Sequence, residues 1–210
     1  MPDGDQNLAL PTTLPRRTHV ATWFVALVAL ALMVFGGRAN AEPSDPPAPP
    51  LPVFQPAASN WTPKFPFPFD ATRKDVTPAD ITAEGEMCQW FNAQYAQLVR
   101  QIDQFGFNLV HATGNYGVDR IQEQADAVTA NIDQTVAFLT SRTQSLTQTQ
   151  DFTGDVYFPL YQGESFYRLW QHLSNVGIGI RAHNPAWVYG PSVQRVKHWG
   201  SRIERSHVCD

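Results

Sequence analysis

The chain has little of what most nucleic-acid-binding, metal-binding or disulfide-scaffold proteins depend on. It has 2 Cys among 210 residues, 16% charged residues and a formal net charge of −4. Two cysteines cannot build a framework of several disulfides or a four-cysteine zinc site. A chain without basic excess is not typical of nucleic-acid-binding proteins. We therefore expect no nucleic-acid partner and no cofactor.

Catalytic motifs are lacking too. There is no HExxH or GxSxG sequence, and Gly177-Ile-Gly179 has neither the third glycine nor the preceding strand of a phosphate-binding loop. The acids Asp80, Glu84 and Glu86 fall in the first turns of an expected helix, where the helix dipole favours acidic side chains. We predict that the protein is not an enzyme and has no metal site.

The N-terminal 41 residues have the pattern of an export signal. Arg16-Arg17 precedes an apolar run from Val20 to Phe35, and small residues stand at Ala39 and Ala41. This pattern predicts a signal peptide over residues 1–41 with cleavage after Ala41. We expect a secreted protein or one of the cell envelope or periplasm. In the alternative, an uncleaved segment would be the chain's only membrane contact, although about 24 Å of helix is short for a core of about 30 Å.

Prolines are concentrated in one stretch. Ten of the 17 prolines lie between Pro43 and Pro68. Proline donates no backbone hydrogen bond, so this stretch should be extended and polyproline-like. We assign residues 42–74 as a proline-rich tether. From Trp61 to Phe69 aromatics alternate with prolines, and we expect this part to lie along the domain surface, docking on a partner's groove being the alternative.

The remaining residues, 75–210, have helical periodicity. Thr77 is a capping residue followed by Pro78 at the first helical position. Apolar residues then recur at spacings of three and four: Cys88, Phe91, Tyr95, Leu98, Ile102 and Phe105. Polar side chains, mostly Gln and Asn, fill the opposite face.

Three further helices are expected by the same reasoning. They run from Val118 to Leu139, from Gly163 to about Val176, and from Pro191 to about His207. Gly106 is expected to end or interrupt the first helix, and Gly177 and Gly179 to weaken the third. The fold class is therefore all-α, a compact bundle of about four helices.

The two cysteines bracket the helical domain. Cys88 lies in the first helix and Cys209 is the penultimate residue. Two cysteines of an exported protein are expected to pair. We predict a Cys88–Cys209 disulfide that clamps the C-terminus onto the first helix.

Charge and aromatic side chains are unevenly distributed. Residues 42–164 hold 6 basic and 15 acidic residues, whereas residues 165–210 hold 6 basic and 2 acidic ones. Either the two parts pack together in one fold, or the basic part faces an anionic partner. The aromatics of the same region either build the core or line a ligand or partner surface. The candidate residues for that surface are Tyr161, Trp170, His172, Arg181, His183, Trp187, Tyr189 and Trp199.

Short motifs suggest a family resemblance. They are Lys64-Phe-Pro-Phe-Pro before Cys88, the segment Leu160-Tyr-Gln-Gly-Glu-Ser165 opening a helix with Trp170 and His172, and the terminal Cys209. With the Ala-rich signal and the proline-rich N-terminus, the chain resembles small exported proteins of mycobacteria and related actinobacteria. One such group, a helical fold closed by a disulfide, is implicated in siderophore export, and the resemblance carries over no ligand-binding residue.

These observations favour an exported, non-enzymatic accessory or interaction protein of the bacterial cell envelope. Its expected partner is an envelope protein or a transport system. The alternative is a carrier or binding protein for a lipid or siderophore-like apolar ligand. The two differ in what the structure should contain: an exposed apolar or basic surface for the first, and an apolar cavity for the second.

Overall fold

The computed structural model describes residues 45–63, 69–118, 120–146, 149–150 and 156–210. The chain divides into two units, Met1–Glu42 and Pro43–Asp210. The expected signal peptide lies outside the described residues. Within the described ranges, no helix is long and apolar enough to cross a membrane.

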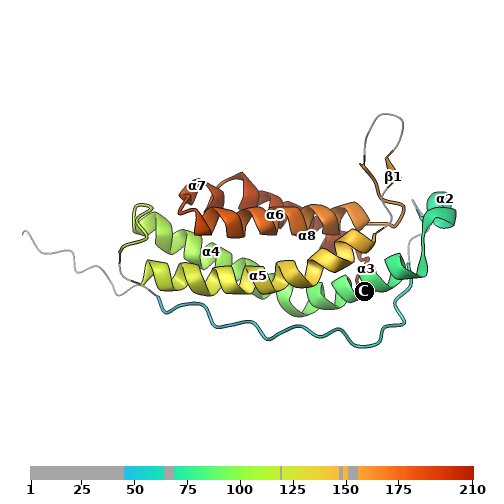
Figure 1. The fold of residues 1–210 in the computed structure, drawn as a ribbon, viewed down its shortest axis with the longest axis horizontal. Coiled ribbons are helices and arrows are strands. Elements are labelled where there is room, and N and C mark those ends of the chain that lie inside the picture. The colour runs from blue at the N-terminus through green and yellow to red at the C-terminus, as the bar shows by residue number, and fades with distance from the viewer. Residues whose placement is uncertain (1–44, 64–68, 119, 147–148, 151–155) are drawn as a thin grey trace, which may run out of the picture. The chain divides into compact units, whose positions relative to one another are not determined.

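Residues of the second unit form an all-α bundle, as predicted (Figure 1). The first long helical segment comprises α3 (Pro78–Trp90), a π-helical turn η2 (Phe91–Tyr95) and α4 (Ala96–His111). The other long helices are α5 (Ile121–Ser145), α6 (Gly163–Arg181) and α8 (Pro191–Ser206). α6 packs between α5 and α8, and α5 packs on α3 and α4.

Short elements connect these helices. α2 (Phe69–Thr72) and the 3₁₀ turn η1 (Arg73–Asp75) precede α3, and α7 (Pro185–Val188) joins α6 to α8. The two-residue strands β1 (Thr149–Gln150) and β2 (Val156–Tyr157) pair antiparallel between α5 and α6.

The predicted start of the first helix is confirmed, but its predicted end is not. Thr77 and Asp80 form a reciprocal capping box, with Asp80 Oδ2 accepting from the Thr77 amide at 2.8 Å. Gly106 neither ends nor interrupts the helix, which continues to His111. Gly106 instead faces Val188 of α7.

Gly177 and Gly179 also lie inside an uninterrupted helix, against the expectation that they weaken it. A side chain at Gly177 would come within 3.1 Å of Ile132 on α5, and one at Gly179 would collide with Trp187. Glycine costs helix stability relative to alanine, but at these two positions it allows neighbouring elements to approach closely. The helix is kept because packing outweighs intrinsic propensity.

The disulfide between Cys88 and Cys209 is present, as predicted. It joins the last turn of α3 to the end of the chain, 121 residues later. Two further contacts hold the same end: Asn92 Nδ2 donates to the Cys209 carbonyl at 2.9 Å, and Trp61 Nε1 donates to the Val208 carbonyl at 2.9 Å. Trp61 therefore lies along the domain, as expected for its segment.

The proline-rich residues 45–63, which we call the strap, are not a tether outside the domain. They belong to the same unit as the helices and run along α4, α5 and α3 (Figure 1). Leu51 of the strap is only 4% exposed. The assignment of 42–74 as a tether is therefore wrong for these residues, because the helices supply hydrogen bonds that the prolines cannot make among themselves.

Two rows of side-chain amides hold the strap. The Asp45 carbonyl and carboxylate accept from Gln124 and Gln104, both at 2.6 Å. The Pro49 carbonyl accepts from Gln101 at 2.9 Å and from Asn131 at 3.1 Å. The Pro52 carbonyl accepts from Gln94 and Gln134, both at 2.7 Å. At each of the three levels, α5 gives one amide and the helix facing it gives the other. We call these six residues the amide rows.

A carboxyl group buried in α3 has no such partners. Glu84 is fully buried, and among the described residues neither of its carboxylate oxygens has a hydrogen-bond partner. Burial raises the pKa of Glu84 well above the usual range, and the nearby charge of Asp80 raises this pKa further. The folded protein therefore holds Glu84 in its neutral form at pH values where the unfolded chain ionises it.

This difference makes stability depend on pH. Because the pKa of Glu84 is higher in the folded protein than in the unfolded chain, the contribution of protonated Glu84 to stability is complete below the unfolded pKa. This contribution is lost as the pH rises through the folded pKa. We expect the unfolding free energy of the wild type to fall relative to Glu84→Gln by up to about 1.4 kcal/mol per pH unit above pH ~4.5. Urea titrations of both proteins between pH 4 and 9 measure this difference, with exposed Glu123→Gln as control. Parallel pH profiles of wild type and Glu84→Gln would contradict it.

Candidate functional site

The eight residues predicted to share one ligand or partner surface lie in three places. Trp170 faces α5 and Tyr161, just before α6, packs against the core. His172 and Trp199 lie where α6 meets α8. Arg181 ends α6 and pairs with Asp133, and His183, Trp187 and Tyr189 lie in and around α7. The region is thus part core and part surface, and each group has its own environment.

The group facing α5 is largely structural. Trp170 is half-buried, and its Nε1 donates to Thr140 Oγ1 at 2.9 Å. Tyr167 lies between the rings of Trp170 and Phe158, with centroid distances of 5.5 and 5.3 Å. Tyr161 packs against the core. These rings are occupied in fixing α6 on α5.

The group between α6 and α8 is a basic surface. Burial lowers the pKa of His172, and the positive charges of Arg195 and Arg168 lower it further. Trp199 is buried, with the Arg202 guanidinium 4.9 Å from its ring centroid. Among the described residues, Arg195 and Arg202 have no acidic partner within 4 Å.

Other basic residues of the C-terminal part are paired with the acidic part. Lys197 contacts Asp103 of α4, and Arg181 contacts Asp133 of α5, both at 2.7 Å. Some basic residues of the C-terminal part therefore pair with acidic residues of the preceding part, and others remain on the α6–α8 surface. Half-exposed pairs of this kind contribute little individually, about 0–1 kcal/mol.

The third group forms an aromatic surface at one end of the bundle, at the left in Figure 1. Trp187 is 38% exposed, Tyr189 46% and Ile178 52%. The ring of His183 stacks on Tyr116 at a centroid distance of 4.2 Å. We call Tyr116, Ile178, His183, Trp187 and Tyr189 the aromatic end. Its exposed apolar members, Ile178, Trp187 and Tyr189, are of the kind found at interaction surfaces.

The backbone around α7 fixes this surface. α6 ends where His183 takes a left-handed conformation with φ 50°. Pro185 begins α7 and packs against Gly114 of the α4–α5 connection, and Val188 packs on Gly106. Trp187 lies across Gly179, so that the aromatic end packs directly on α6.

Tyr116 is the least accessible member of the aromatic end. Burial raises the pKa of Tyr116 to about 12, with a smaller contribution from neighbouring Tyr189. Its hydroxyl is buried without a hydrogen-bond partner among the described residues. Tyr116 therefore remains a neutral platform for His183.

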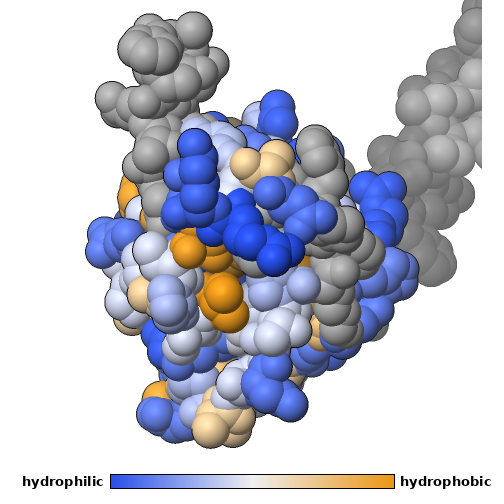
Figure 2. All heavy atoms as spheres, turned by 90° about the vertical axis from the view of Figure 1, so that its right-hand side faces the viewer, coloured by the Kyte–Doolittle hydropathy of each residue, from blue (hydrophilic) through white to orange (hydrophobic). Residues whose placement is uncertain are grey.

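The opposite end of the bundle is shown in Figure 2. Hydrophilic side chains surround a small hydrophobic area there. Of the aromatic rings of the predicted surface, only those of His183, Trp187 and Tyr189 lie at the α7 end, where they are joined by Ile178 and Tyr116, which were not among the predicted residues. The sequence pattern did not indicate these two residues. Ile178 is a single apolar residue beside Gly177, and Tyr116 lies in a loop, so neither belongs to a periodic pattern.

Two hollows flank the strap. One of about 570 Å³ lies between residues 45–49 and the helices α4 and α5. Another of about 350 Å³ lies beside Val53–Pro56, against Trp90, Phe138 and Arg142. Their lining comes from the strap and from the helices together.

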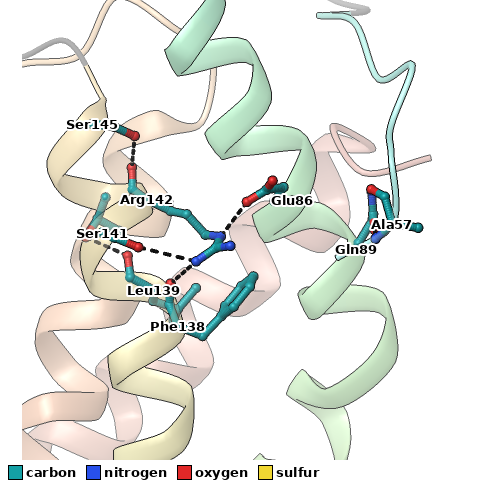
Figure 3. A network of polar contacts seen from close by, with 9 residues as sticks. Ala57, Glu86, Gln89, Phe138, Leu139, Ser141, Arg142 and Ser145 are labelled. Atoms are coloured by element: carbon teal, nitrogen blue, oxygen red, sulfur yellow. Dashed lines mark hydrogen bonds and ion pairs between the residues drawn. The ribbon is translucent and has the colours of Figure 1, made fainter. Parts of the chain in front are cut away.

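Arg142 at the second hollow is held on three sides. Its Nε contacts Glu86 at 2.7 Å, its Nη1 donates to the Phe138 carbonyl at 2.8 Å, and its guanidinium lies 3.7 Å from the centroid of the Phe138 ring (Figure 3). Nearby, Gln89 exchanges two hydrogen bonds with the Ala57 backbone of the strap. This arrangement joins α5 to α3 and leaves Arg142 little capacity for a ligand.

No group of three His, Cys, Asp or Glu within the described residues could hold a metal ion. Comparisons with known protein families, with curated proteins and with solved structures found no match.

Proposed function

We propose that the protein is an exported, non-enzymatic accessory protein of a bacterial cell envelope that binds an envelope protein or transport system through the aromatic end. The exposed Trp187, Tyr189 and Ile178, with Trp187 packed on α6 at Gly179, are the observation that carries this proposal. Large aromatic side chains of this kind dominate binding energy at protein interfaces. The disulfide and the N-terminal apolar run are both compatible with export.

Site-specific photocrosslinking in the producing cell tests the interaction. A benzophenone side chain at Ile178 should form an adduct with one envelope protein, whereas the same group at exposed Gln144 on α5 should not. Trp187→Ala should lower the adduct yield more than tenfold, because an aromatic anchor contributes about 2 kcal/mol or more. Val53→Ala, which truncates an exposed apolar side chain of the strap, is the matched control.

Two results would contradict the proposal. One is equal adduct formation from Ile178 and Gln144, and the other is an adduct yield that Trp187→Ala leaves unchanged. The mass of the exported protein tests its location: a chain beginning at Glu42 supports a cleaved signal peptide, a retained N-terminus supports the anchor, and a cytoplasmic chain with free thiols rejects export.

The second candidate function is a carrier for a small apolar or amphipathic ligand. The hollow of about 570 Å³ favours it, because its size lies in the range of small-molecule sites. This hollow lies between the strap and the helices rather than at the centre of the bundle. The two functions use different surfaces and are tested separately.

A further inference from the structure

The larger hollow lies where the strap passes from one level of the amide rows to the next. Asp45 is held by Gln104 and Gln124, and Pro49 by Gln101 and Asn131. Between these levels, Pro46, Pro47 and Ala48 form one wall of the hollow. The strap is thus fixed at both ends of the hollow and encloses it from one side.

The deep part of the hollow is apolar. Phe105 of α4 and Val128 of α5 line it, and each is only 1% exposed. Above this buried base, Pro46, Pro47 and Ala48 present the accessible apolar surface that an aromatic or aliphatic group can cover. The polar side chains Gln101 and Gln124 line it as well, but their amides already bind the strap and their neighbours Asn131 and Asn108.

Two polar side chains at the hollow make no hydrogen bond within the described part of the chain, namely Gln97 and Arg100. They stand three positions apart on α4, which places them on one side of the helix. Arg100 also has no acidic partner within 4 Å among the described residues. A guanidinium in this position is suited to bind a carboxylate with two parallel hydrogen bonds.

Asp45, also at the hollow, sets the orientation of a ligand. Its carboxylate accepts from Gln104, one helical turn beyond Arg100, and would repel an anion at that side. An acid group would therefore lie at Arg100 and Gln97, with the apolar body directed over Phe105 and Val128.

We propose that this hollow binds a small amphipathic organic acid, with the carboxylate at Arg100 and a ring or short acyl chain against the prolines and the apolar base. This inference specifies the ligand of the second candidate function and does not rest on the aromatic end. It involves no covalent step.

The test uses the exported protein and two matched probes, 4-phenylbutyrate and its uncharged amide. In ¹H–¹⁵N NMR titrations, the acid should shift the signals of Arg100, Phe105 and Val128, with a Kd of about 1 mM expected for a probe of about twelve heavy atoms. The acid should bind about fivefold or more tightly than the amide. Arg100→Gln should abolish this preference, whereas Arg195→Gln, which removes another arginine without an acidic partner, should keep it.

The outcomes separate the inference from the function it specifies. Equal binding of acid and amide overturns the assigned ligand class, and a preference that persists in Arg100→Gln overturns the placement of the carboxylate at Arg100. In both cases the hollow remains a binding site. Shifts confined to the aromatic end, or no shifts at all, overturn both the inference and the second function. Neither result affects the photocrosslinking test.

Discussion

Removal of the disulfide by Cys88→Ala with Cys209→Ala should lower the unfolding free energy by about 5 kcal/mol. In the chain-entropy description, the cost grows with the length of the closed loop, and here the cysteines stand 121 residues apart. For a protein of this size the loss corresponds to a decrease in Tm of roughly 10–20 °C. Urea and thermal unfolding followed by circular dichroism measure both quantities.

The double variant and the reduced wild type serve as mutual controls. Both lack the bond, but only the variant loses the buried Cys88 sulfur, so close agreement between them assigns the effect to the bond itself. The C-terminus should also become more accessible to carboxypeptidase, because only the core packing of Val208 and the hydrogen bonds from Trp61 and Asn92 would then hold it. A variant as stable as the oxidised wild type would show that the remaining contacts suffice.

The sequence predicted the parts of this fold that depend on local spacing. Capping rules and helical periodicity predict the helix starts at Thr77-Pro78, Gly163 and Pro191. The redox environment of an exported protein predicts that its two cysteines pair. These rules need only a few neighbouring residues or a simple count. They therefore held without knowledge of the tertiary structure.

The glycines of the first and third helices were misjudged because the reason for them is not local. At Gly177 and Gly179 the missing side chain makes room for Ile132 on α5 and for Trp187 on α7, and Gly106 faces Val188 of α7 in ordinary contact, so each reason lies in another element of the fold. A single sequence shows only the low helix propensity of glycine. For the same reason the aromatic end could be predicted only in part: the residues around α7 were recognised, but not their platform, Tyr116.

The strap was misjudged for a related reason. Each of the two amide rows consists of three residues at spacings of seven and then three: Gln94, Gln101 and Gln104 in one, and Gln124, Asn131 and Gln134 in the other. On a helix this places each set on one polar side, which resembles a solvated surface. Only the structure shows that the two sides face each other and that their amides bind the backbone of a polyproline-like segment.

Asn131→Ala should have the second-largest effect, because Asn131 is the central residue of the amide rows. It is 2% exposed, its Oδ1 accepts from the Leu51 amide at 2.9 Å, and its Nδ2 donates to Pro49 and to Gln101. The substitution leaves the buried Leu51 amide without an acceptor, at a cost of about 1–3 kcal/mol, and removes two further hydrogen bonds. We expect a total loss of about 3 kcal/mol and release of the strap around Leu51.

Two measurements distinguish release of the strap from general destabilisation. Limited proteolysis under native conditions should cut Asn131→Ala within residues 45–63 at least tenfold faster than the wild type, while the disulfide-closed helices stay intact. Gln144→Ala, an exposed position on the same helix, is the matched control and should resemble the wild type. If Asn131→Ala lowers stability without faster cleavage of the strap, then Leu51 and Trp61 hold the strap by apolar packing, and the amide rows define its register rather than its attachment.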